Sequence, residues 1–218
     1  MRKNLLPGIN LDITEEALII QSGEPLLCLS SAVVGGGFQE TKTIINMHVD
    51  KYYSNPNPTG DLDLFARRNG ISDPFIGLMT AVYTNDVQLV NLIDDQLQIS
   101  AVITAGLGNA VAVGLDEPYR TQLSPGTINI ILIFNSMLSK SAMVNAVISA
   151  TEAKTALLQQ MGIKTPGGHQ PTGTSTDSVV IACQPSEIEY HYAGPLTTPG
   201  WMIGKAVRQA FNAQFSLS

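Results

Sequence analysis

Short apolar runs rich in β-branched residues occupy much of the chain and predict strands. Gly, Pro or acidic turns separate most of these runs. The run at 126–135 is almost continuously apolar, as expected for a strand covered on both faces. The predicted strands cover residues 17–22, 25–34, 42–49, 75–83, 98–109, 126–135 and 178–183.

A 3.6-residue period of apolar positions predicts two long helices in the last third of the chain. The first extends from Ser139, its N-cap, to Gly162 just past its end. The second covers 198–215, with Thr198 as N-cap and Pro199 at the first helical position. A shorter helix is predicted between Asp61, as N-cap, and Gly70. The first long helix has an apolar face of Met143, Val147, Ala150, Leu157 and Met161.

The order of these elements favours an α+β layered sandwich over regular βαβ alternation, because strands dominate the first half and the long helices come late. The 218 residues contain no repeat or linker, so we expect one domain, residues 1–218. A hydrophobic share of 44% with 14% charged residues is ample for a sizeable core.

Charge and targeting signals narrow the class of protein. The net charge is −6 and no Lys/Arg cluster is present, so we expect no nucleic-acid partner. No signal peptide opens the chain, and no run approaches the ~20 apolar residues that span a bilayer. We therefore expect a cytoplasmic protein with no membrane association. Cys28 and Cys183 lie in apolar runs and are expected to be buried small hydrophobes.

Metal and phosphate motifs are missing from the sequence. His48, His169 and His191 are far apart, and no C-x-x-C or H-x-x-x-H spacing occurs, so we predict no metal and no cofactor. The glycine-rich segments at 33–40 and 104–114 do not match a phosphate-binding loop. The three glycines at 35–37 serve either a close approach to a ligand or a wide hairpin turn.

Two polar features stand out against this apolar background. The segment "PTGTSTDSVVIA" places five hydroxyl side chains and Asp177 at the start of a strand, where they either cap that strand or line a site. Lys154 falls about 20° from the centre of the apolar face of the 139–161 helix, whereas Glu152 points to the opposite side. A lysine there snorkels, pairs with an acid, or reaches a polar cavity.

Read in order, several blocks of the chain resemble the adenosylcobinamide amidohydrolase family. They include "VITAGLGNA", "GTINIILIFN", "YAGPLTTPGWMIGKAV" and, most specifically, "ATEAKTALLQQMGI" followed by "TGTSTDSVV". Gly35 stands where the family resemblance leads us to expect Asn. The resemblance implies a hydrolase of corrinoid salvage that cleaves the aminopropanol amide of adenosylcobinamide to give adenosylcobyric acid. Cobalt belongs to this substrate and is not a cofactor.

A second resemblance concerns mechanism. "GTINIILIFNSMLS", a helix and then "TSTDSVVIA" are similar to the self-processing ornithine acetyltransferase and β-aminopeptidase families. This resemblance implies two β-sheets packed between helical layers (αββα-like) and a nucleophile at the start of a strand, here Thr127. If the chain is cut before Thr127, its free amine serves as base; otherwise Lys154 or Asp177 does.

These resemblances set the candidate site. We expect Thr127, Asn109, Lys154 and Asp177 to be catalytic, with the turn at 106–109 offering N–H groups to an oxyanion. The residues expected to contact the corrinoid are Gly36, Gly37, His48, Gly106, Gly108, Glu152, Thr174, Ser175 and Thr176.

Two other functions fit the same sequence. One is a corrinoid-binding or delivery protein without turnover, and the other is a hydrolase of a different small amide. The long helices also suggest a homodimer.

Overall fold

The computed structural model describes residues 1–72, 74–117 and 126–216. Within them the protein is a mixed α/β molecule with three α-helices and a nine-stranded sheet. The helices are α1 (Pro58–Arg68), α2 (Lys140–Gln160) and α3 (Thr198–Phe215). The sheet contains β1 (Arg2–Leu6), β2 (Ile9–Ile13), β3 (Ala17–Ser30), β4 (Gly37–His48), β5 (Phe75–Thr80), β6 (Gln88–Asp94), β7 (Leu97–Ala105), β9 (Ile128–Phe134) and β12 (Ser178–Cys183).

Short elements complete the fold. Two-residue strands form the pairs β8 (Ala110–Val111) with β11 (Gly173–Thr174) and β10 (Met137–Leu138) with β13 (Glu189–Tyr190). A 3₁₀ turn covers Thr84–Asp86. The β8–β11 pair matters for function because it holds the turn after β7 against the hydroxyl-rich segment.

Strand β3 connects the two halves of the sheet. Its first half pairs with β2, its second half pairs with β12, and β4 runs beside it along most of its length. The sequence predicted two strands here, but they form one 14-residue strand with an irregular register between Gln21 and Leu26. Pro25 lies within that interval and has no N–H for a ladder, so the pairing lapses without ending the strand.

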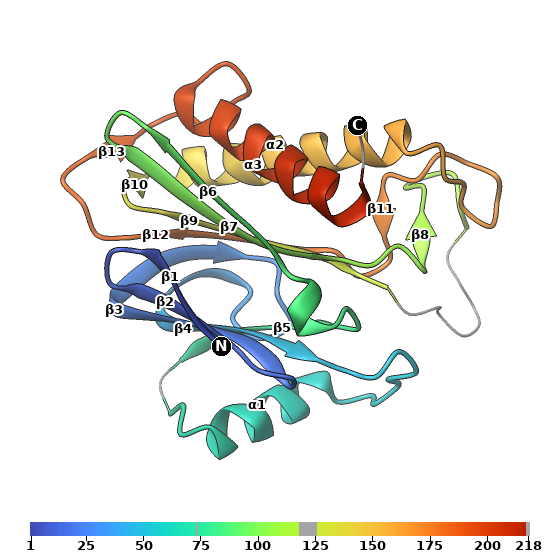
Figure 1. Ribbon diagram of the computed structural model, residues 1–218, viewed down its shortest axis with the longest axis horizontal. Coiled ribbons are helices and arrows are strands. Elements are labelled where there is room, and N and C mark those ends of the chain that lie inside the picture. Colours follow the sequence, from blue (N-terminus) through green and yellow to red (C-terminus); the bar gives the residue numbers. More distant parts are fainter. Residues whose placement is uncertain (73, 118–125, 217–218) are drawn as a thin grey trace.

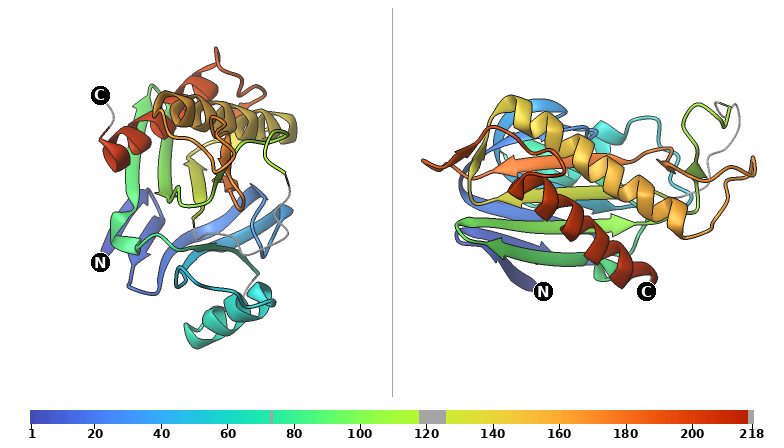
Figure 2. Two further views of the ribbon diagram at one scale, coloured as in Figure 1. Left: turned by 90° about the vertical axis from the view of Figure 1, so that its right-hand side faces the viewer. Right: turned by 90° about the horizontal axis from the view of Figure 1, so that it is seen from above.

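The continuity of β3 joins the two groups of strands into one sheet. Strands β1–β5 and strands β6, β7, β9 and β12 belong to one hydrogen-bonded sheet that folds over on itself. Figure 1 shows α2 and α3 above the second group of strands and α1 below β4 and β5. Figure 2 shows α2 and α3 side by side on that outer face.

Three clusters of buried side chains match this arrangement. One lies between the two groups of strands and includes Leu26, Ile44 and Ile131. The second lies under α2 and α3, and the third lies under α1. Strand β9 is buried at all seven positions, which confirms the prediction of a strand covered on both faces.

The helix ends follow the capping chemistry with small corrections. Ser139 caps α2, accepting from Ala142 N at 3.2 Å, and Gly162 follows the helix with φ +68°, as predicted. Helix α3 is capped by Thr197, one residue before the predicted Thr198. Helix α1 is capped by Asn57 and begins at Pro58, not at Asp61. Asp61 lies within the first turn of the helix, and its carboxylate accepts from Tyr53 and Asn55.

Sequence patterns missed strands β1, β2 and β6. β1 has three exposed residues, β2 alternates between buried and half-buried residues, and β6 has no buried residue, so none of them is a continuous apolar run. The two cysteines behave as predicted: both are buried and free, and burial raises the pKa of the Cys28 thiol and raises that of Cys183 to about 12. Among the helices of the described chain, none is long and apolar enough to cross a membrane.

Candidate active site

The carboxylate of Asp177 organises the hydroxyl-rich segment. It accepts from Lys154 Nζ at 2.5 Å, from Thr174 N at 3.1 Å, from the Thr174 hydroxyl, and from Ile128 N at 3.1 Å. This half-buried carboxylate therefore ties α2, the first residue of β9 and its own turn together. Thr127 immediately precedes this tied position, so the same contacts fix its backbone.

The lysine in the apolar face of α2 is thus a paired lysine. Lys154 is 7% exposed, and the side chain of its ion-pair partner Asp177 is 15% exposed. Gly173 makes room for the pair: a Cβ there would lie 2.8 Å from Lys154 Nζ and would collide with the Asp177 carboxylate. Losing one partner of such a buried pair typically costs about 3–5 kcal/mol, because the other charge remains buried.

Thr127 lies at the entrance to β9 with its hydroxyl held by Thr176. Thr127 Oγ1 donates to Thr176 O at 2.8 Å and lies 3.0 Å from Thr176 Oγ1. The Thr176 hydroxyl also reaches Gly126 O at 3.1 Å. Neither Lys154 nor Asp177 bonds to the Thr127 hydroxyl, so no basic side chain among the described residues is in hydrogen-bond contact with it.

The glycine turn at 106–109 packs directly against the Gly126–Thr127 peptide. Gly106 N donates to Thr127 O at 2.9 Å. A Cβ on Gly126 would lie 2.9 Å from Gly108 N and 3.0 Å from Asn109 N, which shows how closely these groups approach. Neither of these two N–H groups has an acceptor within the described parts of the chain. The two donors therefore lie beside the Gly126–Thr127 peptide; Asn109 lines the same cavity as Thr127, and Gly108 does not.

Asn109 joins this turn to the hydroxyl-rich segment. Its Nδ2 donates to Ser175 Oγ at 2.6 Å, while Oδ1 is buried and has no partner among the described residues. The sequence predicted the side-chain amide as an oxyanion donor. In the structure one of the two Nδ2 hydrogens is donated to Ser175, and no second acceptor is present among the described residues, so the amide stays a predicted donor beside the backbone N–H groups. A buried acceptor left unpaired costs roughly 1–3 kcal/mol, which a bound ligand could recover.

These residues line a cavity of about 280 Å³, here called the Thr127 cavity. Thr127, Asn109, Ser175 and Thr176 form one wall, and residues 49–51 and 79–81 contribute to the other. Lys154, Asp177 and Thr174 line a different cavity of about 580 Å³, here called the Lys154 cavity. Ser175 lines both cavities, so the segment 173–178 is the partition between them.

A buried polar chain supports the floor of the site. Asn129 Nδ2 donates to Asn46 Oδ1 and to Met79 O, both at 2.8 Å, and Asn46 Nδ2 donates to Thr104 Oγ1 at 3.1 Å. These side chains come from β4 on one side and from β7 and β9 on the other. They therefore clamp the two groups of strands together two residues beyond Thr127.

Sequence reasoning missed the opposite wall of the Thr127 cavity. Asp50, Lys51 and Tyr53 line it from the loop before α1. The Tyr53 hydroxyl donates to Asp61 Oδ2 at 2.7 Å, and Asn55 Nδ2 donates to the same oxygen at 2.8 Å. Burial and then the Asp61 carboxylate raise the pKa of Tyr53 to about 12. The available signal was the charged and aromatic stretch "HVDKYYSNPNPTGD" directly after a strand.

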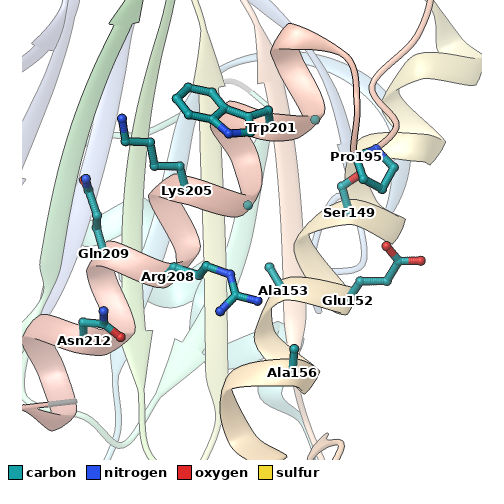
Figure 3. A pocket seen from close by; sticks show the side chains of 12 residues that line it. Ser149, Glu152, Ala153, Ala156, Pro195, Trp201, Lys205, Arg208, Gln209 and Asn212 are labelled. Carbon is teal, nitrogen blue, oxygen red and sulfur yellow. The ribbon is translucent and has the colours of Figure 1, made fainter. Parts of the chain in front are cut away.

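Several predicted contacts do not line either cavity. His48 Nδ1 is 3.0 Å from Val82 O and its ring packs on Tyr83, although its neighbours Val49 and Asp50 do line the Thr127 cavity. Gly36 lies in the connection between β3 and β4, and Gly37 is the first residue of β4. Gly106 and Gly108 also line neither cavity. Glu152 is exposed on the outer side of α2, in a groove with Trp201 (Figure 3).

Gly35 occupies the position where the family resemblance predicts Asn. The backbone conformation there restricts which residue types fit. Its φ is +73°, a region that glycine enters freely and asparagine tolerates. A Cβ at this position would also lie 2.8 Å from Phe75 O. The departure from Asn is therefore compatible with the local backbone.

The combination of a held hydroxyl, free N–H donors and a cavity is typical of acyl-transferring hydrolases. The model of the adenosylcobinamide amidohydrolase family matches residues 4–216, and the chain belongs to that family. An adenosylcobinamide amidohydrolase of Methanosarcina mazei is 33% identical over 215 residues, covering 94% of this chain and 96% of that protein.

Two further similarities accompany this match. An adenosylcobinamide amidohydrolase of Halobacterium salinarum is 33% identical over 120 residues, covering 53% of this chain and 49% of that one. The solved structure of a Burkholderia β-aminopeptidase covers 91% of this chain and 77% of its own, with 11% identity and a TM-score of 0.49.

Proposed function

We propose that this protein hydrolyses the amide between the corrin propionyl group and aminopropanol in adenosylcobinamide, releasing adenosylcobyric acid. The observation that carries the proposal is that Thr127 and Asn109 line one cavity, while the N–H groups of Gly108 and Asn109, which lack acceptors in the described structure, approach the adjoining Gly126. A cavity of about 280 Å³ suits the amide arm, and the much wider corrin ring stays at its mouth.

Thr127 Oγ1 is the attacking atom in this mechanism. It adds to the amide carbon while the N–H groups of Gly108 and Asn109 stabilise the negative oxygen. The leaving amine takes a proton and departs, which leaves an ester between Thr127 and the corrin propionyl group. Water then hydrolyses this ester, restoring the hydroxyl and releasing the acid.

The base in this scheme is the amine of Thr127 itself, freed by cleavage of the Gly126–Thr127 bond. Thr127 Oγ1 attacks the Gly126 carbonyl carbon, the peptide nitrogen leaves as an amine, and water hydrolyses the resulting ester to a Gly126 carboxylate. Two contacts support this step: Thr176 Oγ1 lies 3.1 Å from Gly126 O, where negative charge develops, and 3.0 Å from Thr127 Oγ1. Lys154 and Asp177 are then positioning residues.

Several wider expectations belong to the same proposal. The reaction needs no resident metal or cofactor, the protein is cytoplasmic, and it works as a homodimer. We also assign the fold to the αββα layered class, with the folded sheet as its two inner layers. Each of these stays a prediction.

Incubation of the purified protein with adenosylcobinamide, followed by chromatography of the corrinoids, tests the function. We expect adenosylcobyric acid and free aminopropanol in equal amounts. Tight cobinamide binding without product would favour a delivery protein, and activity on simple peptide amides alone would favour a different amidase. Intact-mass spectrometry of the same sample tests the cleavage, because two fragments meeting at Gly126 and Thr127 are expected.

A further inference from the structure

Among the described residues, three strands lie at free ends of the nine-stranded sheet, and β6 is the least protected of them. β1 carries Arg2 and Lys3, side chains that discourage association between strand edges. β5 pairs with β4 on one side, and Val34 bridges to Gly77 on its other side. β6 pairs with β7 without a bulge and contains no lysine, arginine or proline. Figure 2 shows β6 along one border of the molecule.

The outer side of β6 presents backbone groups without partners. In a strand that is paired on one side only, every second residue points its N–H and C=O away from the neighbouring strand. Within the described parts of the chain, no backbone hydrogen bond outside the β6–β7 ladder involves residues 88–94. This seven-residue edge is therefore a template for one further strand.

The inner face of β6 is also open, because the layer beneath it stops at β7. Ser100 on β7 donates to Leu5 O of β1 at 2.9 Å, which places β1 under β7. Asn91 of β6 lies opposite Ser100 on the same face and is exposed, and Ile93, two residues further along that face, is 70% exposed. β6 thus extends beyond the inner layer, which leaves room for another strand beside it.

The sequence of β6 is complementary to itself. In both directions from Asn91, "QLVNLID" has two apolar residues followed by a polar one. Two copies can therefore pair antiparallel with their Asn91 residues opposite each other. The other opposite pairs are then Val90 with Leu92 of the partner subunit, Leu89 with Ile93 of the partner subunit, and Gln88 with Asp94 of the partner subunit. Apolar side chains meet apolar ones, and no two like charges lie opposite each other.

We propose that β6 is a dimerisation edge, where a second copy of this chain pairs antiparallel about a two-fold axis that passes between the two Asn91 residues, perpendicular to the sheet. The self-complementary pattern selects a second copy over an unrelated strand. The pairing adds about six to eight main-chain hydrogen bonds and covers Ile93 with Leu89 of the partner subunit. It places the contact on a strand edge and not on the long helices. No residue of β6 lines the Thr127 cavity or the Lys154 cavity, and the proposal does not depend on the reaction catalysed.

Within β6, Asn91 alone lies opposite its own copy, and this gives a direct test. We expect the full-length protein to sediment as a dimer within the range of about 1 to 100 µM. Asn91→Lys and Asn91→Asp each place two like charges opposite one another and should weaken dimerisation about 10-fold or more. An equimolar mixture of the two variants, one of them isotopically labelled, should give mostly the mixed dimer in native mass spectrometry. Gln96→Lys, in the exposed turn after β6, is the matched control and keeps the parent dimer.

Amide hydrogen exchange of the parent protein tests the same edge without a substitution. The outward N–H groups of β6 should exchange more slowly at about 100 µM than at about 1 µM. Asn91 is exposed, so circular dichroism should show an intact fold in both of its variants. A parent protein that is monomeric throughout this range would overturn the proposal. So would a dimer that survives Asn91→Lys, a mixture without mixed dimers, or exchange in β6 that does not change on dimerisation.

Discussion

The Thr127 cavity and the Lys154 cavity lie on opposite sides of one short segment, residues 173–178, and differ in how their polar groups are paired. On the Lys154 side, Asp177 accepts four hydrogen bonds and Lys154 has its acid. On the Thr127 side, the N–H groups of Gly108 and Asn109 and the Asn109 side-chain oxygen lack partners within the described residues.

This contrast suggests a structural role for the residues of the Lys154 cavity and a catalytic role for those of the Thr127 cavity. A charge pair that is buried and satisfied is expensive to disturb and poorly suited to exchange protons, so it fixes geometry. Neutral groups left unpaired at a cavity are available to a ligand. Variants on the Thr127 side should therefore change the rate, and variants on the Lys154 side should first change the stability.

The largest effect is expected from Thr127→Ala. Without the hydroxyl the acyl intermediate cannot form, so kcat should fall about 10⁴-fold or more, with the unfolding midpoint nearly unchanged. The protein should also remain one chain in intact-mass spectrometry. Thr127→Ser is the control, and we expect it to keep both activity and cleavage. Full activity in the folded alanine variant would remove Thr127 from the mechanism.

Lys154→Met comes next. The methionine keeps the apolar stem but leaves Asp177 buried without its cation, so the free energy of unfolding should drop by about 3–5 kcal/mol. Urea denaturation measures this loss. The double variant Lys154→Met with Asp177→Asn removes both charges and should recover part of it. A single variant that is as stable and active as the parent would show that the ion pair does not organise the site.

Asn109→Ala tests the turn on the other side of the partition. It removes the link to Ser175 and loosens the turn that holds the Gly108 and Asn109 N–H groups, so kcat should fall about 100-fold. The control is Ser175→Ala, which removes only the acceptor of the Asn109 side chain and should cost less. Steady-state kinetics of both variants decide the ranking. The reverse order would place the essential contact on Ser175.

Tyr53→Phe is expected to give the smallest effect. Tyr53 lines the cavity, and loss of one hydroxyl contact to the substrate arm should lower kcat/KM about 10-fold at most. Because its pKa is raised to about 12, the phenol stays protonated below about pH 10, and the variant should keep the shape of the parent pH profile.

The raised pKa of Tyr53 also makes the free energy of unfolding depend on pH. A raised pKa means that the folded state holds the phenol proton more tightly, so this contribution is present below about pH 10 and is lost as the pH approaches 12. The difference in unfolding midpoint between parent and Tyr53→Phe should shrink over that interval. A difference that grows with pH would contradict the Tyr53–Asp61 hydrogen bond.

The sequence predicted those parts of the fold that rest on local chemistry. The Ser139 cap, Gly162 and the buried β9 follow from capping and hydrophobic patterns, and the structure has them. The joining of two predicted strands into β3 depends on pairing with β2, β4 and β12, which no local pattern reveals. The edge strands β1 and β6 were missed because their exposed faces break the apolar run.

The candidate site, like the fold, was predicted from the sequence only in part. Lys154 and Asp177 were singled out from the sequence because one interrupts an apolar helical face and the other lies in a hydroxyl-rich segment. Only the structure shows that Lys154 pairs with Asp177 and that Thr127 lines a different cavity. Asp50, Lys51 and Tyr53 escaped because their loop reaches the cavity only after β4 and β5 have paired.

The position of β12 controls the order in which the chain can fold during synthesis. β12 is formed by residues 178–183 and lies between β3 and β9, so the centre of the sheet stays open until most of the chain has left the ribosome. Until then β3 and β9 each present an unpaired apolar edge, which is a template for association with other nascent chains. The pairings among strands β1–β5 can form earlier, because apart from the β3–β12 edge they join strands that all lie before residue 81. Translation pauses before residue 178 should therefore favour aggregation, whereas pauses after residue 183 should not.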